Sequence, residues 1–241
     1  MNLTTIPPQS LEKETLQKHK VCVIKSRFAN LYSVQNALQW VGVEAIISDS
    51  DEEISQSDIL ILPGVGSFAQ VVEELESKNL IQIIKKNIDL GKPFLGICLG
   101  MQLLFERGYE GNKISQGLGI LQGEVIPIPA DIGARIPHIG WNSLKFESVE
   151  MQKELLNPLE ESSQAEAQVY FVHSFYCSAH NSSNVIANVE IVPGWKAPAI
   201  VGKSNCFGMQ FHPERSGKIG LKLLENFLRI AIKLQGKPRL D

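Results

Sequence analysis

The sequence predicts one α/β domain with a mostly parallel central sheet flanked by helices and with additional, partly antiparallel strands in the second half. Two observations predict this class. Apolar, strand-like runs alternate with amphipathic helical patterns in the first half, which is typical of a parallel sheet covered on both faces. The chain of 241 residues, 44% of them hydrophobic, is also long enough to bury a sizeable core.

The first half supplies the alternation of strands and helices. Each predicted strand is a short apolar run, and each predicted helix carries its apolar residues at helical spacing. The predicted strands are Val21–Ile24, Val43–Ile47, Ile59–Leu62 and Pro93–Ile97, and the predicted helices present Leu31, Val34, Leu38 and Val41 on one face or cover Ala69–Glu76 and Leu80–Ile88.

The second half changes character, because short β-like runs follow one another before a closing helix. We expect residues 1–20, which are polar and contain Pro7 and Pro8, to form a loosely held extension, and residues 21–241 to form the domain. The acidic stretch 147–167 is predicted to be a surface excursion. The predicted elements are strands at Glu124–Ile128, Gln168–Val172, Val185–Glu190 and Phe207–Phe211, a short helix at Gln152–Leu156 and the closing helix Lys218–Leu234.

Charge and composition exclude several classes of function. A net charge of -3 and an isoelectric point near 6.0 provide no basic stripe for nucleic acid. The apolar runs are too short to cross a bilayer, and the N-terminal region lacks the apolar segment of a signal peptide. Four widely spaced cysteines predict neither a disulfide framework nor a zinc site. We expect a cytoplasmic protein that needs no metal or other cofactor.

The sharpest local signal is the segment Gly-Ile-Cys-Leu-Gly at 96–100, which follows a buried strand and precedes an amphipathic run from Met101 to Glu106. This is the strand, nucleophile and helix order of a nucleophile elbow, with Cys98 as the nucleophile. A thiol at a helix N-terminus meets the positive end of the helix dipole, which favours the thiolate. The alternative is that Cys98 is a small buried core residue, because short Gly-rich motifs recur by chance.

A nucleophilic cysteine needs a histidine to take its proton and a third group to orient that histidine. Among the five histidines, His212 stands out because it ends a strand-like run and is followed by Pro213 and Glu214. Cys98, His212 and Glu214 would therefore form a catalytic triad. Taken alone, His212 would more often be a strand-end histidine capped by a carbonyl group, and Glu214 a solvated carboxylate.

A third segment, Pro-Gly-Val-Gly-Ser at 63–67, follows the apolar run Ile59–Leu62 and opens a helix. Its glycines allow backbone N–H groups to point at a ligand, as an oxyanion hole requires. A phosphate cradle is the alternative, because Gly-rich turns before helices also bind anions. The segment lacks the spacing and the Lys-Ser/Thr pair of a P-loop, which favours the oxyanion hole.

Together these residues resemble the class I (triad) glutamine amidotransferases, and among them the family of glutaminase subunits of imidazole glycerol phosphate synthase. The similar segments occur in the family's order and span nearly all of residues 21–234. The shared sequences are Leu-Pro-Gly-Val-Gly-Ser-Phe at 62–68, the run from Gly91 to Glu106 around the elbow, Pro-His-Ile-Gly-Trp-Asn at 137–142, Tyr-Phe-Val-His-Ser-Phe-Tyr at 170–176 and Gly-Met-Gln-Phe-His-Pro-Glu-Arg-Ser-Gly at 208–217.

The resemblance assigns roles to the matching positions. It implies that Cys98 attacks the side-chain amide of glutamine, that His212 moves the protons, that Glu214 orients His212, and that water then hydrolyses the thioester. A helix-surface amide is the alternative for Gln102. By resemblance, the oxyanion hole involves Gly64, Val65, Gly66 and Leu99, and glutamine is held by Gln102 and the backbone of His173, Ser174 and Phe175.

The resemblance also implies a partner. After the glutaminase elements we expect no further domain in this sequence to bind an acceptor for the ammonia. In the family, the partner is a (β/α)8-barrel cyclase that forms a heterodimer with the glutaminase and serves histidine biosynthesis. We expect the interface to include Trp141, Asn30 and Arg215, with Trp141 in a loop between Gly140 and Asn142; a buried core tryptophan is the alternative for Trp141.

Two departures from the family pattern leave other partners open. The usual Asp-Tyr-Gly-x-Gly-Asn is here Lys-Ser-Arg-Phe-Ala-Asn at 25–30, and Arg215 stands where a lysine is usual. One alternative is therefore a paralogue that supplies ammonia to a cyclase-like partner in surface-sugar modification. Another is a catalytically silent subunit that serves assembly.

Overall fold

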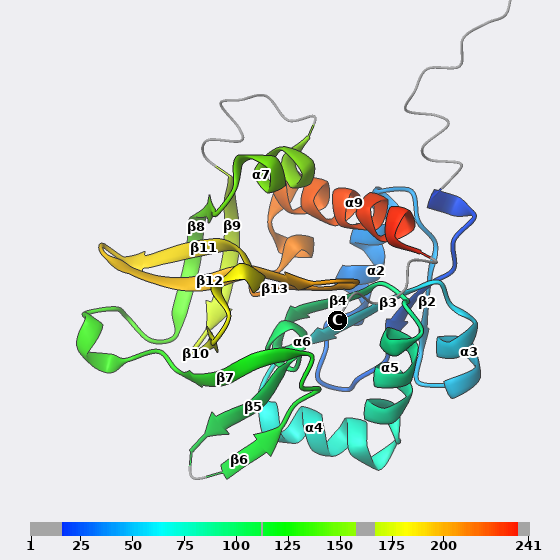
Figure 1. Ribbon diagram of the computed structural model, residues 1–241, viewed down its shortest axis with the longest axis horizontal. Helices are drawn as coiled ribbons and strands as arrows, with labels where there is room; N and C mark the ends of the chain where they lie inside the picture. Colours follow the sequence, from blue (N-terminus) through cyan, green and yellow to red (C-terminus); the bar gives the residue numbers. More distant parts are fainter. Residues whose placement is uncertain (1–15, 112, 158–166, 236–241) are drawn as a thin grey trace, which may run out of the picture.

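The computed structural model describes residues 16–111, 113–157 and 167–235, and two sheets make up its frame (Figure 1). In this described part, a nine-stranded sheet has the order β2-β1-β3-β4-β13-β12-β11-β8-β9, and a four-stranded sheet has the order β10-β7-β5-β6. The first five strands of the large sheet run parallel, and the remaining neighbours pair antiparallel. The predicted fold class is confirmed, including the antiparallel strands of the second half.

Most strands of the large sheet correspond to predicted apolar runs, and β8 and β12 are strands that were not predicted. In chain order they are β1 (Val21–Ile24), β2 (Ala45–Ser48), β3 (Ile59–Gly64), β4 (Phe94–Cys98), β8 (His138–Phe146), β9 (Gln168–His173), β11 (Val185–Val192), β12 (Trp195–Lys203) and β13 (Cys206–Met209). The small sheet contains β5 (Phe105–Glu110), β6 (Lys113–Gln116), β7 (Leu121–Pro127) and β10 (Phe175–Ala179).

Helices cover both faces of the large sheet, with α2, α7 and α9 on one side and α3, α4 and α5 on the other (Figure 1). The α-helices are α2 (Leu31–Trp40), α3 (Asp51–Gln56), α4 (Phe68–Ser77), α5 (Leu80–Asp89), α6 (Leu99–Gln102), α7 (Val149–Leu156) and α9 (Gly217–Leu234), and the 3-10 helices are η1 (Ala130–Ile132), η2 (Ser182–Asn184) and η3 (Pro213–Arg215).

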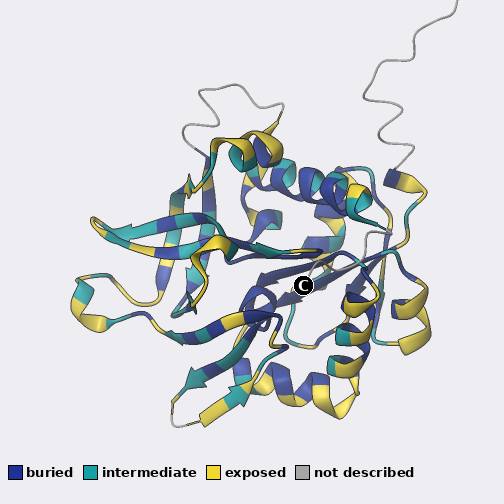
Figure 2. Cartoon of the chain, viewed as in Figure 1, coloured by how far each residue is buried: buried dark blue, intermediate teal, exposed yellow. Residues whose placement is uncertain are grey.

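Alternating side chains of the central strands fill two separate cores. Val21 and Val23 of β1 pack on the side of α2 and α9, whereas Cys22 and Ile24 pack on the side of α4 and α5. Successive strand residues point to opposite faces, so a strand that is apolar throughout feeds both cores. Figure 2 shows the result as buried central strands between helices with exposed outer faces.

Parallel pairing brings three strand ends to one edge of the large sheet. In the register between β3 and β4, Gly64 lies opposite Cys98. In the register between β13 and β4, Met209 lies opposite Ile97, so the residues after β13 emerge beside Cys98. In open α/β sheets this carboxyl edge is where ligands bind.

Several sequence expectations need correction. The amphipathic run 101–106 does not continue as a helix, because α6 ends at Gln102 and β5 begins at Phe105. Trp141 lies within strand β8 rather than in a loop. Helix α3 and strands β5, β6, β8, β10 and β12 were not anticipated from their apolar patterns, because most of them are half-exposed and carry mixed residues.

The start of the ordered fold lies before Val21. Most of the predicted extension 1–20 is outside the described residues, but Leu16 is buried in the core on the α2 side. The backbone N–H of Lys20 also donates to the Asp58 carboxylate over 2.8 Å. The division into residues 1–20 and 21–241 otherwise stays a prediction, as does the excursion 147–167, of which 158–166 lie outside the described residues.

None of the helices in the described ranges combines the length and apolar character that a membrane crossing requires.

Gly100 gives a test of the packing between β3 and α6. A Cβ atom at this position would lie 1.8 Å from the carbonyl oxygen of Leu62, so Gly100→Ala forces two backbones apart. We expect the free energy of unfolding, measured by chemical denaturation, to fall by about 4 kcal/mol or more. Gly133→Ala is the control: it has a positive φ of 78° and open space around it, so a loss of about 1–2 kcal/mol is expected. Equal losses in the two variants would contradict the packing argument.

Candidate active site

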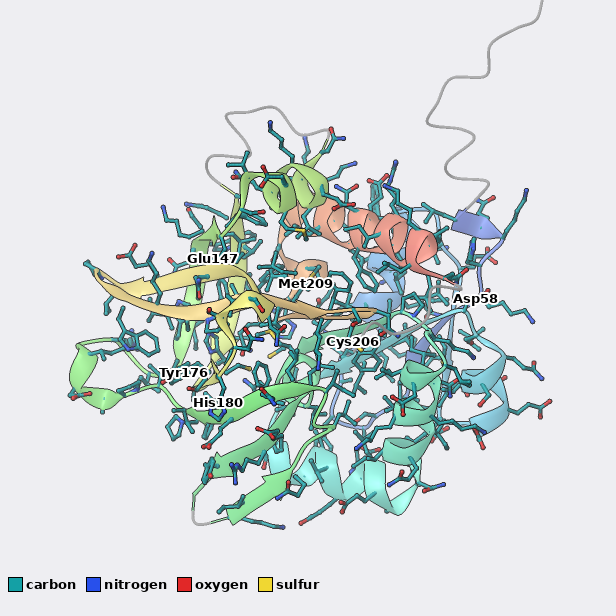
Figure 3. All side chains as sticks on the ribbon, in the orientation of Figure 1. Asp58, Glu147, Tyr176, His180, Cys206 and Met209 are labelled. Atoms are coloured by element: carbon teal, nitrogen blue, oxygen red, sulfur yellow. The ribbon has the colours of Figure 1, made fainter. Side chains whose placement is uncertain are left out.

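The carboxyl ends of β3, β4 and β13 bring the predicted site residues together. Cys98 is the last residue of β4, Gly64 is the last residue of β3, and His212 follows β13 by three positions. In Figure 3, the labels Cys206 and Met209 mark the two ends of β13, which lies in the middle of the molecule. The site therefore lies at the centre of the sheet, where strands on both sides restrict movement.

The backbone of Cys98 has the strained conformation of a nucleophile elbow. Its φ of 55° and ψ of -108° lie in a region that non-glycine residues rarely adopt, at a cost of about 1–3 kcal/mol. The turn directs the chain from β4 into α6, with Cys98 at the N-cap position. Because α6 has only four residues, its dipole is small, and the N–H groups of its first turn are the main electrostatic contribution.

Two glycines allow the elbow to pack. A Cβ atom at Gly96 would lie 2.2 Å from the carbonyl oxygen of Gly100, and one at Gly100 would overlap Leu62. Both contacts involve backbone atoms, which cannot rotate away. The sequence Gly-x-Cys-x-Gly is therefore required here by close backbone approach, as expected from the flanking glycines.

His212 and Glu214 form a buried pair beside the elbow. Nδ1 of His212 lies 2.7 Å from Oε1 of Glu214, and their side chains are 6% and 2% exposed. The N–H of His212 donates to the carbonyl of Tyr170, and the Ser216 hydroxyl donates to the carbonyl of His212, which fixes the histidine backbone. Within the described residues, Nε2 of His212 makes no hydrogen bond of ordinary geometry and is thus available to the thiol and the reacting atoms.

The electrostatics favour a protonated His212. Burial lowers the pKa of His212, but the Cys98 sulfur and the Glu214 carboxylate together outweigh burial and raise it above its usual value. A histidine held between a carboxylate and a sulfur atom is stabilised as a cation when the sulfur is a thiolate. This arrangement can generate a nucleophile and supply a proton to a leaving group.

The predicted oxyanion segment reaches the elbow, but one donor is occupied. Gly64 packs against Leu99, because a Cβ atom there would lie 3.1 Å from the Leu99 Cβ. The backbone N–H of Val65 donates over 2.7 Å to the carbonyl of Phe28, in the loop where the sequence departs from the family pattern. Val65 can therefore serve an oxyanion only if this hydrogen bond breaks. Gly66 has a positive φ of 91°, which its lack of a side chain permits.

Gln102 is a buried residue of the site rather than a helix-surface amide. Its side chain is only 4% exposed, and its Nε2 lies 3.4 Å from the carbonyl oxygen of Phe175. His173 is also buried, and its Nδ1 contacts the same carbonyl over 2.8 Å. The carbonyl of Ser174 accepts a backbone hydrogen bond from Ile128. These predicted glutamine contacts thus lie together around the Phe175 carbonyl, where β9 leads into β10 and Gln102 of α6 approaches.

The predicted interface residues divide into two groups. Trp141 is 51% exposed, so it is not a core tryptophan, and its ring packs edge-on against Tyr170 at 6.0 Å. The guanidinium of Arg215 lies 5.3 Å above the same Tyr170 ring. Asn30 instead caps helix α2, accepting from the N–H of Ser33, which explains this asparagine without an interface.

Sequence reasoning missed two features of the site. Gln210 is fully buried and donates to the Cys98 sulfur, and His138 contacts His173 over 3.0 Å. A glutamine inside the apolar run Phe207–Phe211 was the available signal for the first, because buried amides need partners. The pairing of His138 with His173 depends on strand register, which the sequence does not provide.

The fold and this constellation define a glutamine amidotransferase. A family model described as glutamine amidotransferase class-I matches residues 22–231, and the chain belongs to this family. Individual relatives are similar to this chain over nearly their whole length. The imidazole glycerol phosphate synthase subunit HisH of Aquifex aeolicus (strain VF5) is 44% identical over 216 residues, covering 89% of this chain and 99% of that protein. The HisH subunit of Lactococcus lactis subsp. lactis (strain IL1403) is 44% identical over 211 residues, covering 87% and 98%.

Solved structures share the fold at lower identity. A structure of PurLQS from Thermotoga maritima matches with a TM-score of 0.67 and 22% identity, covering 88% of this chain and 98% of that chain. A crystal structure of a glutamine amidotransferase matches with a TM-score of 0.64 and 18% identity, covering 87% and 98%. These matches confirm the fold class independently of the site.

His173 predicts a pH dependence of stability. Burial, with smaller effects of His138 and His212, lowers the pKa of His173 from 6.5 to about 4. As the pH falls through 6.5, the unfolded chain binds a proton at this residue that the folded chain does not bind until about pH 4, so folding stability is lost over this window. Between pH 7.5 and 5 the loss from this group is about 2 kcal/mol.

The measurement is urea unfolding of wild type and His173→Asn at pH 7.5 and 5. The stability difference between the two proteins should shrink by about 2 kcal/mol at the lower pH. His180→Asn, in an exposed turn, is the control and should leave the pH dependence of wild type unchanged. A difference that stays constant with pH would show that His173 does not remain neutral in the folded protein.

Proposed function

We propose that this chain is the glutaminase subunit of imidazole glycerol phosphate synthase, which hydrolyses glutamine to glutamate and ammonia for use by a cyclase partner in histidine biosynthesis. The observation that carries the proposal is the meeting of a strained Cys98 with the buried pair of His212 and Glu214. The names of the HisH relatives, whose length the chain covers almost completely, support the particular pathway.

In the proposed reaction, the sulfur of Cys98 attacks the side-chain amide carbon of glutamine. Nε2 of His212 takes the thiol proton and returns it to the nitrogen that leaves as ammonia, so the C–N bond breaks and a thioester forms. His212 then activates water, which hydrolyses the thioester to glutamate and frees the thiol. Glu214 keeps the histidine oriented and stabilises its charge through the 2.7 Å contact.

The same proposal assigns the remaining site residues. Oxyanion stabilisation would come from the N–H of Leu99 at the start of α6 and from the Gly64–Gly66 segment, with Val65 contributing once its N–H leaves the carbonyl of Phe28. Gln102 and the backbone of residues 173–175 would hold glutamine beside the thiol. The oxyanion hole would then have two arrangements. It would be less active while the Val65 N–H is bound to the Phe28 carbonyl, and more active once that hydrogen bond is broken.

We further propose that the partner is a (β/α)8-barrel cyclase, bound as a heterodimer, which uses the ammonia to form imidazole glycerol phosphate and aminoimidazole carboxamide ribotide. The relatives are named as subunits, which supports a complex. The exposed ring of Trp141, supported by Tyr170 and Arg215, would anchor the interface. None of the four cysteines, all of which lie within the described residues, forms a disulfide bond, in keeping with a reducing cytoplasm.

The test is glutamate release from glutamine by purified protein, alone and with the host's cyclase subunit and its ribonucleotide ligand. We expect strong stimulation by the cyclase and ligand, and loss of at least about a thousandfold in activity with Cys98→Ala. Cys206→Ala, a buried thiol on β13 outside the proposed site, is the matched control and should retain activity.

The other outcomes of this experiment separate the remaining functions. Activity that depends on Cys98 but is not stimulated by the cyclase would favour a paralogue serving a surface-sugar pathway. No activity in any mixture, with a folded protein, would favour a silent assembly subunit. Either result would overturn the proposed pathway assignment.

Trp141 provides a separate test of the interface. Because exposed tryptophans often dominate binding energy, Trp141→Ala should weaken binding to the cyclase by about 2 kcal/mol or more, roughly thirtyfold in Kd. Calorimetric titration measures the affinity directly. Trp40→Ala, at the C-terminal end of α2 and 80% exposed, is the control and should bind like wild type. Equal affinities of wild type and Trp141→Ala would exclude Trp141 as an anchor.

A further inference from the structure

A chain of buried polar groups begins at the sulfur of Cys98. Nε2 of Gln210 donates to this sulfur over 3.7 Å, and Oε1 of Gln210 accepts from Nε2 of Gln102 over 3.1 Å. Gln210 is completely buried at the carboxyl end of β13, and its backbone N–H donates to the carbonyl of Ala199. Hydrogen bonds therefore fix both the backbone and the side chain of Gln210, and one of its amide N–H groups points at the sulfur of Cys98.

The chain continues from Gln102 to strand β8. Nε2 of Gln102 and Nδ1 of His173 both contact the carbonyl oxygen of Phe175, at 3.4 and 2.8 Å. Nε2 of His173 lies 3.0 Å from Nδ1 of His138, and Nε2 of His138 lies 2.7 Å from the amide nitrogen of Asn142. Hydrogen bonds thus connect β8, β9, β10, α6 and β13 in one path.

The direction of each hydrogen bond follows from the acceptor at Phe175. A carbonyl only accepts, so Nδ1 of His173 must carry the proton that it donates. Burial lowers the pKa of both His173 and His138, so each ring is neutral near pH 7 and its second nitrogen is an acceptor. His138 then donates to His173 and accepts from Asn142. In this way both nitrogens of each histidine ring have a hydrogen-bond partner while both rings stay neutral.

Gln210 has a clear physical effect on the thiol. A buried amide without partners costs about 1–3 kcal/mol, and an apolar side chain of similar length would fill the same space without that cost. An N–H aimed at sulfur favours the charged thiolate over the neutral thiol and restricts the rotation of the Cys98 side chain. The amide therefore gives the sulfur a fixed donor in addition to the small dipole of the four-residue helix α6.

From this geometry we infer that Gln210 is a further residue of the glutaminase centre, whose amide holds the Cys98 sulfur for attack, and that His138 and His173 are positioning residues that fix Gln102 through the Phe175 carbonyl. The inference deepens the proposed function and rests on it. It makes the reactivity of Cys98 depend on strand β8, which carries Trp141.

The first test follows alkylation of Cys98 by iodoacetamide in the full-length protein between pH 5 and 9, with mass spectrometry to identify the modified cysteine. In Gln210→Met, we expect the alkylation rate at pH 7 to fall by about tenfold, because the sulfur loses the amide donor that holds it. Gln122→Met, on the exposed side of β7, is the matched control and should behave like wild type.

Gln210→Glu gives a second variant of nearly unchanged shape, in case the first one does not fold. As a carboxylate it retains an acceptor for Gln102, offers no donor to the sulfur and brings a negative charge beside it, so a fall in alkylation at least as large is expected. Wild-type alkylation rates in a folded Gln210 variant would overturn the role of Gln210. Alkylation requires neither glutamine nor a cyclase, so a protein that fails the glutaminase assay but passes this one would lose only the proposed function.

The positioning role is tested by two substitutions of His138. The amide of Asn can take the place of Nδ1 and still donate to His173, whereas Leu cannot. We expect His138→Leu to raise the KM for glutamine about tenfold and His138→Asn to restore it to within about threefold of wild type. Equal KM values in the two variants, both folded by circular dichroism, would overturn the positioning role of the histidine pair.

Discussion

The site depends on one contact between two backbones. Where α6 leaves β4, Gly100 lies against the carbonyl of Leu62 on β3, with no space for a Cβ atom. This contact sets how closely the elbow approaches the next strand, and therefore how near Cys98 lies to Gly64 and the oxyanion segment. On the other side of β4, the pairing with β13 places Gln210 and His212 beside the thiol. A small change in this packing would affect the nucleophile, the base and the oxyanion donors together.

The second constraint is that the chain passes from one sheet to the other beside the thiol. His173 ends β9 of the large sheet, and Phe175 begins β10 of the small one. The carbonyl of Phe175 accepts from His173 on one side and from Gln102 on the other. The segment proposed to hold glutamine is thus anchored to both sheets, which limits its freedom before any ligand binds.

The sequence predicted the first half of the fold well, because strands buried on both faces leave continuous apolar runs and the helices between them keep a clear apolar face. It failed around residues 101–106, where an amphipathic pattern contains one helical turn and the start of a strand, β5, whose residues are mostly half-exposed. The triad could be proposed because Cys98 and His212 each follow a recognisable strand. Gln210 and His138 were not predicted as parts of the site, since their roles depend on the register of strands distant in sequence.

The backbone strain at Cys98 also restricts which nucleophile this scaffold accepts. With φ at 55°, a second heavy atom on Cβ would collide with the adjacent peptide groups, so a β-branched threonine cannot adopt the elbow without distorting it. Serine fits the same backbone, but its hydroxyl is far less acidic than a thiol. Designs that aim at a new acyl-transfer chemistry on this scaffold are therefore confined to unbranched nucleophiles. A serine at this position would rely on His212 to take its proton during the attack itself.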